Sequence, residues 1–281
     1  MFNFCNLYSG SSGNCSFIET DNAKILIDCG TSYKKIKEGL ESINQDIHDL
    51  DAILITHEHS DHIKGLSVLS KNVDVPVYAN KKTLDEIEKK SFISKSYSFK
   101  TDETFEINDL KVHPFKIPHD AVDPVGFTID HKGTKISIAT DIGHVENKLL
   151  KNLNESSFVL LESNYEPDIL KSSKYPYLLK HRILGPEGHL SNEDASTIIK
   201  TLVKNGLQNI MLGHLSKENN FPELAYQTTV NELIQSNVDM DNLSLTVADR
   251  DRVNNIIEIK KWRPQRIYPL RPSGTLLPNC C

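Results

Sequence analysis

A single segment, ILITHEHSDHIKG at residues 53–65, limits the folds open to this chain more than any other. An apolar run leads directly into a polar stretch that contains His57, His59, Asp61 and His62. In an extended chain, residues at i, i+2 and i+4 lie on the same side, and entry into a helix at His62 turns its ring toward the same point. The segment therefore predicts four metal-binding groups at the carboxyl end of a buried strand, where open sheets commonly carry their chemistry.

One loop cannot complete two metal sites, so further ligands should stand at other strand ends. His119 follows the run LKVHPFKIP, Asp141 follows KISIAT and His214 follows NIMLG. A lone His or Asp at a strand end is more often a turn or cap residue, but the first motif favours a ligand role for all three. A carboxylate can bridge two cations about 3.5–4 Å apart, so Asp141 and a shared water would lie between two metals. Coordination lowers the pKa of such a water toward about 7, which predicts a hydroxide nucleophile at neutral pH.

Short apolar runs recur along the chain with turn residues between them, and most are of strand length and rich in Val, Ile, Phe and Thr. The expected strands are FNFCNLY, CSFIET, AKILIDCG, DAILIT, VPVYA, TFEI, LKVHPFKI, VGFTID, KISIAT, SFVLLES, NIMLG and LSLTVA. Helices are expected near residues 32–42, 62–70, 81–90, 145–153, 174–182, 191–204 and 222–236. The order, strands first and then strands mixed with helices, predicts an α/β protein in which helices cover sheets, rather than a strictly alternating barrel.

The chain contains no internal repeat and no low-complexity linker, so residues 1–249 are expected to form one domain. The remaining segment, 250–281, is basic and rich in Pro, Arg and Asn, and it lacks helical or strand periodicity. We expect it to be a poorly ordered or surface-wrapped tail.

Composition excludes several classes of protein. The 281 residues contain no apolar stretch of the roughly 18–20 residues that a membrane helix needs, and the N-terminus lacks the features of a secretory signal. A cytoplasmic protein with no membrane partner is therefore expected. The five cysteines form no C-x-x-C pair, so a metal should sit on histidine and carboxylate. The net charge of −6 gives no general attraction to nucleic acid, so such a partner needs a local basic patch.

The motif TH-E-HSDH resembles the signature of the metallo-β-lactamase fold hydrolases, and the resemblance extends over most of the chain. It implies an αββα four-layer sandwich, in which two sheets are flanked by helices. It also implies one metal on His57, His59 and His119, and a second on Asp61, His62 and His214. Asp141 would bridge the two metals. Ligands of these types suit Zn²⁺, Mn²⁺ and Fe²⁺ alike.

Further segments resemble one branch of that family, the YycJ (WalJ) proteins of bacteria, which are exonuclease-like. They are SGSSGNC, LIDCG, LLESNYEPD, YPYLLKHRILGPEGHLSNEDA and LGHLS. The branch often carries His where this sequence has Tyr165, which is a departure from its pattern.

The segment Gly188-His189-Leu190-Ser191 precedes an expected helix and indicates how a substrate is handled. Amides in the first turn of a helix can bind an anion, and His189 is placed to protonate a departing alkoxide. The segment resembles the Gly-His-Ser/Thr segment of the RNase Z nucleases, where the histidine assists phosphodiester cleavage. A thiolate leaves without a proton, so a proton donor at His189 favours a nuclease. The alternative is that His189 only caps or packs against the start of the helix and has no catalytic role. Asp61 and His189 are thus the predicted catalytic residues.

Substrate contacts are predicted more weakly. Asn14 belongs to the Gly/Ser-rich turn SGSSGN, Ser191 stands at the expected helix start, and Tyr165 offers a ring on which a base can stack. Phosphates could follow the basic tail and Lys171, Lys174, Lys180 and Arg182, although such residues are more often a solvated surface.

Three functions remain open from the sequence. The leading hypothesis is a dimetal-dependent phosphodiesterase, an exonuclease acting on DNA or RNA. A thioesterase or lactonase of small metabolites would use the same metals on another bond. A regulatory protein would keep metal only for structure, but a structural zinc is usually four-coordinate and closed, and seven ligand positions exceed that need.

Overall fold

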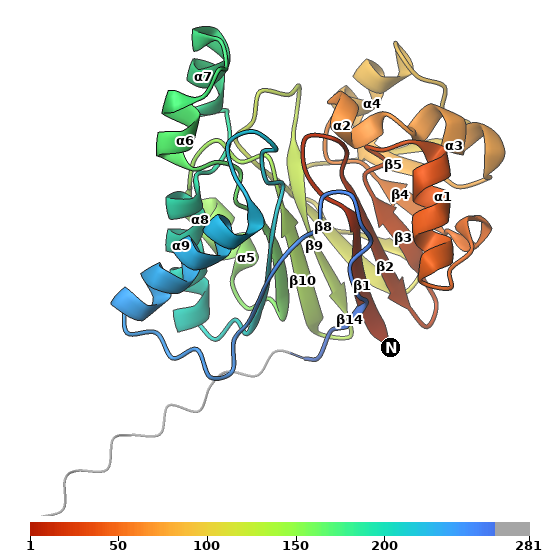
Figure 1. Ribbon diagram of the computed structural model, residues 1–281. Helices are drawn as coiled ribbons and strands as arrows, with labels where there is room; N and C mark the ends of the chain where they lie inside the picture. Colours follow the sequence, from red (N-terminus) through yellow and green to blue (C-terminus); the bar gives the residue numbers. More distant parts are fainter. Residues whose placement is uncertain (262–281) are drawn as a thin grey trace, which may run out of the picture.

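The structure is a computed structural model in which residues 1–261 are described. Within these residues, two seven-stranded sheets lie face to face, and helices cover the outer face of each (Figure 1). The four layers confirm the predicted αββα sandwich. The predicted tail, 250–281, is described only as far as residue 261, and its remainder lies outside the described residues.

The first sheet has the strand order β14-β1-β2-β3-β4-β5-β6. Its strands are β1 (Phe2–Tyr8), β2 (Cys15–Thr20), β3 (Lys24–Ile27), β4 (Ala52–Leu54), β5 (Val77–Asn80), β6 (Ser96–Phe99) and β14 (Ile257–Glu258). Neighbours are antiparallel from β14 to β3 and parallel from β3 to β6.

The second sheet has the order β13-β12-β11-β10-β9-β8-β7. Its strands are β7 (Phe105–Ile107), β8 (Leu110–Lys116), β9 (Val125–His131), β10 (Thr134–Ala139), β11 (Phe158–Glu162), β12 (Asn209–Gly213) and β13 (Ser244–Val247). Pairing is antiparallel from β7 to β10 and parallel from β10 to β13. Two antiparallel steps separate β8 from β10, so β8, β10, β11 and β12 all run in the same direction and end at the same edge.

The helices divide between the two outer faces. They are α1 (Tyr33–Ser42), the 3-10 helix η1 (Ile47–Asp49), α2 (Ser60–Ile63), α3 (Leu66–Asn72), α4 (Lys81–Glu88), α5 (Asn147–Leu153), α6 (Pro167–Ser172), α7 (Tyr177–Ile183), α8 (Asn192–Lys204) and α9 (Pro222–Gln235). Apolar faces of α1, α3 and α4 pack on the first sheet, and those of α5, α8 and α9 pack on the second. None of the described helices is long and apolar enough to cross a membrane.

The strands read as continuous apolar runs because both of their faces are buried. On β1, Phe4 faces the second sheet, where its ring lies 4.6 Å from that of Phe158, while Cys5 and Leu7 face the helices. The layer between the sheets and the two layers under the helices are thus built from alternate residues of the same strands.

Several details differ from the sequence-based expectation, and η1 and α6 lie outside all of the expected helices. Helix α2 begins at Ser60, so Asp61 already lies in the first helical turn rather than in an extended segment. Strand β6 was not predicted, since three of its four side chains are exposed and it lacks an apolar run. Part of the predicted tail adds β14 to β1, and Arg250 donates from Nη2 to Leu215 O at 2.9 Å. The predicted boundary at residue 249 stays a prediction.

Candidate metal centre and active site

The histidine motif follows β4, as predicted, and is held by Thr56 of the same segment and by Asp28, which follows the neighbouring β3. His62 donates from Nδ1 to Asp28 Oδ2 at 2.7 Å, and Thr56 donates its hydroxyl hydrogen to the same carboxylate. The Thr56 hydroxyl then accepts from His57 Nδ1 at 2.9 Å. Because each Nδ1 is engaged, both rings present Nε2 for another partner.

The residues predicted at other strand ends reach the same place. His119 follows β8 and donates from Nδ1 to Gly188 O at 3.1 Å, which leaves Nε2 3.7 Å from Asp141 Oδ1. His214 follows β12 and donates from Nδ1 to Glu162 at 2.8 Å, with its Nε2 3.5 Å from the same Asp141 oxygen. The structure therefore brings the distant residues to the HSDH loop.

Backbone conformation helps to aim three of these side chains. Asp28, Asp141 and His214 have positive φ values of 61°, 60° and 55°. Non-glycine residues seldom adopt this left-handed conformation, and it is found where a chain turns sharply at a functional site. Each of the three ends a strand, so the turn redirects the chain while the side chain stays over the sheet edge.

All seven predicted metal ligands fall into groups whose donor atoms lie within 4.8 Å of one another. The groups are His57, His59 and His119; Asp61, His62 and His214; His57, His62 and Asp141; and Asp141, Glu162, His189 and His214. The first two groups are the two ligand sets implied by the family resemblance. Asp141 appears in the other two groups and lies between the sets, as expected of a bridging carboxylate.

Burial and charge act against each other in this cluster. Burial alone raises the pKa of Asp141, but His214, His62 and His119 outweigh it and hold the pKa well below its usual value. Burial lowers the pKa of His214, yet Asp141, Asp61 and Glu162 raise it to about 10. Burial lowers the pKa of His57 well below its usual range, and His62 adds to this effect, so His57 is neutral. The histidines and the buried carboxylates thus stabilise each other's charged forms, and divalent cations compete with protons for such groups.

Unpartnered atoms test whether the residues present fit a metal. Among the described residues, His57 Nε2, Asp141 Oδ2 and His214 Nε2 are buried without a hydrogen-bond partner. Leaving one buried polar group unsatisfied costs about 1–3 kcal/mol, and native proteins rarely gather several at one point. Two imidazole nitrogens and a carboxylate oxygen are good ligands for a divalent cation, so the residues fit such an ion.

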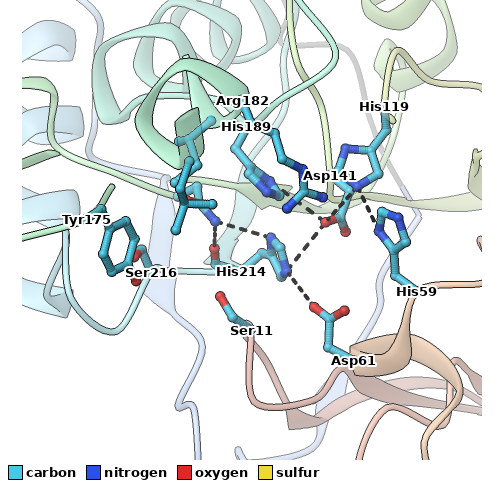
Figure 2. A pocket seen from close by; sticks show the side chains of 13 residues that line it. Ser11, His59, Asp61, His119, Asp141, Tyr175, Arg182, His189, His214 and Ser216 are labelled. Atoms are coloured by element: carbon cyan, nitrogen blue, oxygen red, sulfur yellow. Dashed lines mark hydrogen bonds and ion pairs between the residues drawn. The ribbon is translucent and has the colours of Figure 1, made fainter. Parts of the chain in front are cut away.

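A cavity of about 250 Å³ opens onto the cluster (Figure 2). His119, His189 and His214 surround Asp141 in it, and Asp61 faces His214 from the α2 side at 3.6 Å. The lining residues are Ser11, His59, Asp61, His119, Asp141, Asn164, Tyr175, Leu179, Arg182, Ile183, His189, His214 and Ser216. His57 and His62 lie beneath this surface and are fully buried.

His189 enters the cavity from the loop before α8 and is held by a carboxylate. Its Nδ1 donates to Glu162 Oε1 at 2.8 Å, the same oxygen that accepts from His214. The other oxygen of Glu162 accepts the amide hydrogens of Ile142 and Leu190 at 2.8 and 3.0 Å. Burial would raise the pKa of Glu162, but His189 and His214 lower it to about 2. Glu162 is therefore an ionised anchor shared by both histidines.

The three predicted substrate contacts lie away from the lining of the cavity. Ser191 accepts from Asp194 N and caps α8, but the side chain is buried and lies next to acidic residues of the first turn. Tyr165 is buried with Leu170 and Ile183 under α6 and α7, and burial raises its pKa to about 12. Asn14 is also buried and lies beside the cluster, with Nδ2 3.1 Å from His62 Nε2.

Sequence reasoning missed the residues that orient the ligands. Asp28 and Glu162 end the apolar runs ILI and FVLLE, so the strand-end pattern that indicated His119, Asp141 and His214 applies to both. Thr56 could not be recognised from the sequence, because a hydroxyl residue at a strand end is common. Its role depends on its contacts with Asp28 and His57, which only the structure shows.

Comparison with known proteins places the chain in a family. Residues 23–212 match the family described as the Beta-lactamase superfamily domain. The chain belongs to this superfamily. Exodeoxyribonuclease WalJ of Streptococcus pneumoniae is 42% identical over 243 residues, which cover 84% of this chain and 90% of WalJ. Exodeoxyribonuclease YycJ of Bacillus anthracis is 36% identical over 225 residues, 79% of this chain and 85% of that protein.

The fold is shared with a solved protein of the metallo-beta-lactamase fold. The metallo-beta-lactamase fold protein YhfI from Bacillus subtilis superposes with a TM-score of 0.68 over 91% of this chain and 100% of its own, at 15% identity. The resemblance predicted from the HSDH motif and the branch segments is thus confirmed. Membership and the two relatives support a hydrolase, and the His and Asp groups support divalent metal binding.

Proposed function

We propose that this chain is a metal-dependent exonuclease that hydrolyses phosphodiester bonds of DNA. The single observation that carries the proposal is the position of His189, which shares the Glu162 carboxylate with His214 at 2.8 Å from each. A metal centre alone does not require His189 beside the five ligand histidines, whereas an alkoxide leaving group requires a proton donor beside the metals. The names of the two relatives, which are exodeoxyribonucleases, support DNA as substrate.

Two divalent ions would be held by the seven residues that converge on the cavity. The first would lie on His57, His59 and His119, the second on Asp61, His62 and His214, with Asp141 between them. Zn²⁺ and Mn²⁺ suit these ligands, and Fe²⁺ does so too. When bound, such ions polarise a phosphate and make water nucleophilic at neutral pH.

The chain's own groups then have separate tasks. Asp28, Thr56, Glu162 and the Gly188 carbonyl fix the imidazoles so that Nε2 faces the centre of the cavity. Since His189 Nδ1 is committed to Glu162, its Nε2 delivers the proton to the departing alkoxide. The hydrogen bond to Glu162 keeps the ring of His189 in place before and after that step. Asp61 lines the wall of the cavity opposite His189, the side from which the water would attack the phosphate.

The other functions considered are not favoured. Relatives that match most of this chain are named exodeoxyribonucleases, which argues against a thioesterase, a lactonase or a regulatory protein. A cytoplasmic location, where nucleic acid is available and the buried free thiols of Cys5, Cys15 and Cys29 stay reduced, is part of this proposal.

The test is hydrolysis of end-labelled oligonucleotides by purified protein supplied with Mn²⁺ or Zn²⁺. We expect His189→Ala to lower kcat by about 10²–10⁴-fold, the usual contribution of a positioned general acid, while metal content is retained. Asp61→Ala should lose both activity and metal. His48→Ala, which removes an exposed histidine of η1, is the matched control. Full activity of His189→Ala would reject the assignment.

A further inference from the structure

A second depression, of about 400 Å³, adjoins the catalytic cavity on the side of α7. Its wall includes Asp120, Leu178, Arg182 and Pro186. Arg182 lines both hollows, so the two meet at its side chain. In Figure 2, Arg182 stands beside His189 at the edge of the catalytic cavity. Anything bound in the depression therefore reaches the reacting centre past this arginine.

The tip of α7 exposes two large apolar side chains beside the depression. Tyr177 is 75% exposed and Leu178 is 80% exposed, and no other large apolar residue within 1–261 is as exposed as either. Leu178 and Arg182 are four residues apart, so they lie on one face of the helix. An exposed apolar group at the rim of a site indicates contact with a binding partner.

The α6–α7 segment holds this tip in a fixed position. Tyr165, Leu170 and Ile183 form a small buried cluster beneath it. Lys180 donates from Nζ to the carbonyls of Lys171 and Ser173 at 2.6 and 2.7 Å, which ties α7 back to α6. The exposed side chains thus belong to a supported element.

The charged side chains of α7 indicate the chemistry of the partner that binds in the depression. The last turn of α7 carries Lys180, His181 and Arg182, and the last two line the depression together with the carboxylates of Asp120 and Glu187. The Arg182 guanidinium forms a two-pronged pair with Asp120, from Nε and from Nη2, the latter at 3.0 Å, and its side chain is 49% exposed. A guanidinium fork fits a phosphate as well as a carboxylate, so Arg182 can exchange Asp120 for an entering phosphate.

We propose that this depression is a subsite for one nucleotide of a single-stranded nucleic-acid end. The base packs against Leu178 and Pro186, and the phosphate that follows it meets Arg182 before the chain enters the catalytic cavity. This inference rests on the proposed nuclease function. The same continuity with the cavity, together with the basic turn of α7, favours nucleic acid over a protein partner at this face.

The test compares oligonucleotides with and without a base near the digested end. For the wild-type protein, one abasic residue near that end should raise KM by roughly tenfold, the effect of losing one base contact. In Leu178→Ala, the intact and abasic oligonucleotides should differ in KM by less than about twofold, because the contact is already gone. Ile234→Ala, which removes an apolar side chain that is 60% exposed on α9, should keep the wild-type difference.

The outcomes separate the subsite from the proposed function. Wild-type turnover of bis(p-nitrophenyl) phosphate, a diester without a base, reports phosphodiester cleavage alone. If that diester is cleaved but the abasic residue has no effect on KM, or if Leu178→Ala keeps the full difference, the subsite is overturned and the nuclease stands. If neither the diester nor DNA is cleaved with metal, the proposed function fails. Loss of self-association in Leu178→Ala, with KM unchanged, would make this face a contact between copies instead.

Arg182 gives a second, independent readout. Arg182→Gln should raise KM for oligonucleotides and weaken its dependence on salt by about one phosphate contact. Lys148→Gln, which removes an exposed cation from α5, should leave the salt dependence as it is. An unchanged salt dependence in Arg182→Gln would overturn the phosphate contact.

Discussion

The imidazoles of the cluster are fixed before any ion arrives. His57, His62, His119 and His214 each have Nδ1 engaged by a different group of the protein: a hydroxyl, a carboxylate, a backbone carbonyl and a second carboxylate. This arrangement sets the tautomer and the plane of each ring, so little conformational entropy remains to be lost on binding a metal. At the residue scale, metal binding therefore depends on the groups that hold each Nδ1 as much as on the ligands themselves.

Glu162 is the anchor whose replacement is most informative. Glu162→Gln replaces one acceptor oxygen with an NH₂ group. The glutamine side chain then cannot accept hydrogen bonds from His189, His214 and two backbone amides at once. We expect activity or metal affinity to fall by about 10–100-fold, as for other residues that orient metal ligands. Metal titration followed by calorimetry, together with kcat, measures both effects. Glu106→Gln, at an exposed position of β7, is the control, and equal behaviour of the two variants would contradict the role of Glu162.

The sequence predicted the residues of the cluster because strand ends carry a readable signal. An apolar run that stops at His or Asp is visible without coordinates, and it indicated His119, Asp141 and His214. The roles of Asp28 and Glu162 were not predicted, since the pairing of a carboxylate with a particular imidazole depends on the neighbouring strand. The positions of Tyr165 and Ser191 away from the cavity also depend on how α6 and α8 pack, which spacing along the chain does not encode.

At the element scale, burial on both faces explains which strands were predictable. Strands such as β1 and β11 bury every side chain or nearly so, and their sequences are rich in apolar residues. Strand β6 has an exposed face, and β14 has two residues, so neither produces a pattern in sequence. Strand order is likewise not written in local pattern, because the pairing of β14 with β1 joins residues at opposite ends of the chain.

The contacts of the β14 segment predict that the folded domain extends beyond residue 249. Ile259 is only 7% exposed and joins the core between the sheets, while Ile256, three residues earlier, is 41% exposed. Ile259→Ala should therefore lower the free energy of unfolding by about 2–4 kcal/mol. Ile256→Ala should lower it by less than about 1 kcal/mol. Denaturant unfolding of both variants checks this, and equal stabilities would mean that residues beyond 249 add little to the fold.

At the scale of the whole molecule, the candidate metal centre lies between the two halves of the sandwich. The first sheet and its loops supply His57, His59, Asp61 and His62, and the second supplies His119, Asp141 and His214. In Figure 1, α2 and the α6–α7 segment stand on either side of the same end of the two sheets, above this junction. Each proposed metal draws ligands from both halves, since His119 completes the first set and His214 the second. Bound metal should therefore cross-link the halves in addition to serving the chemistry.

Removal of metal tests this cross-link through stability. A ligand that binds only the folded state and is present at 100 times its Kd stabilises it by about 2.7 kcal/mol. For a chain of this size, that corresponds to a fall in Tm of roughly 5–10 °C per site on chelation. Without the ion, His57 Nε2, Asp141 Oδ2 and His214 Nε2 remain buried without a hydrogen bond, so the loss should be reversed by added Mn²⁺ or Zn²⁺. Asp141→Asn, which removes the carboxylate between the two ligand sets, should show a much smaller shift with chelator. A metal-loaded wild type whose Tm is the same with and without chelator would show that the ions do not hold the two halves together.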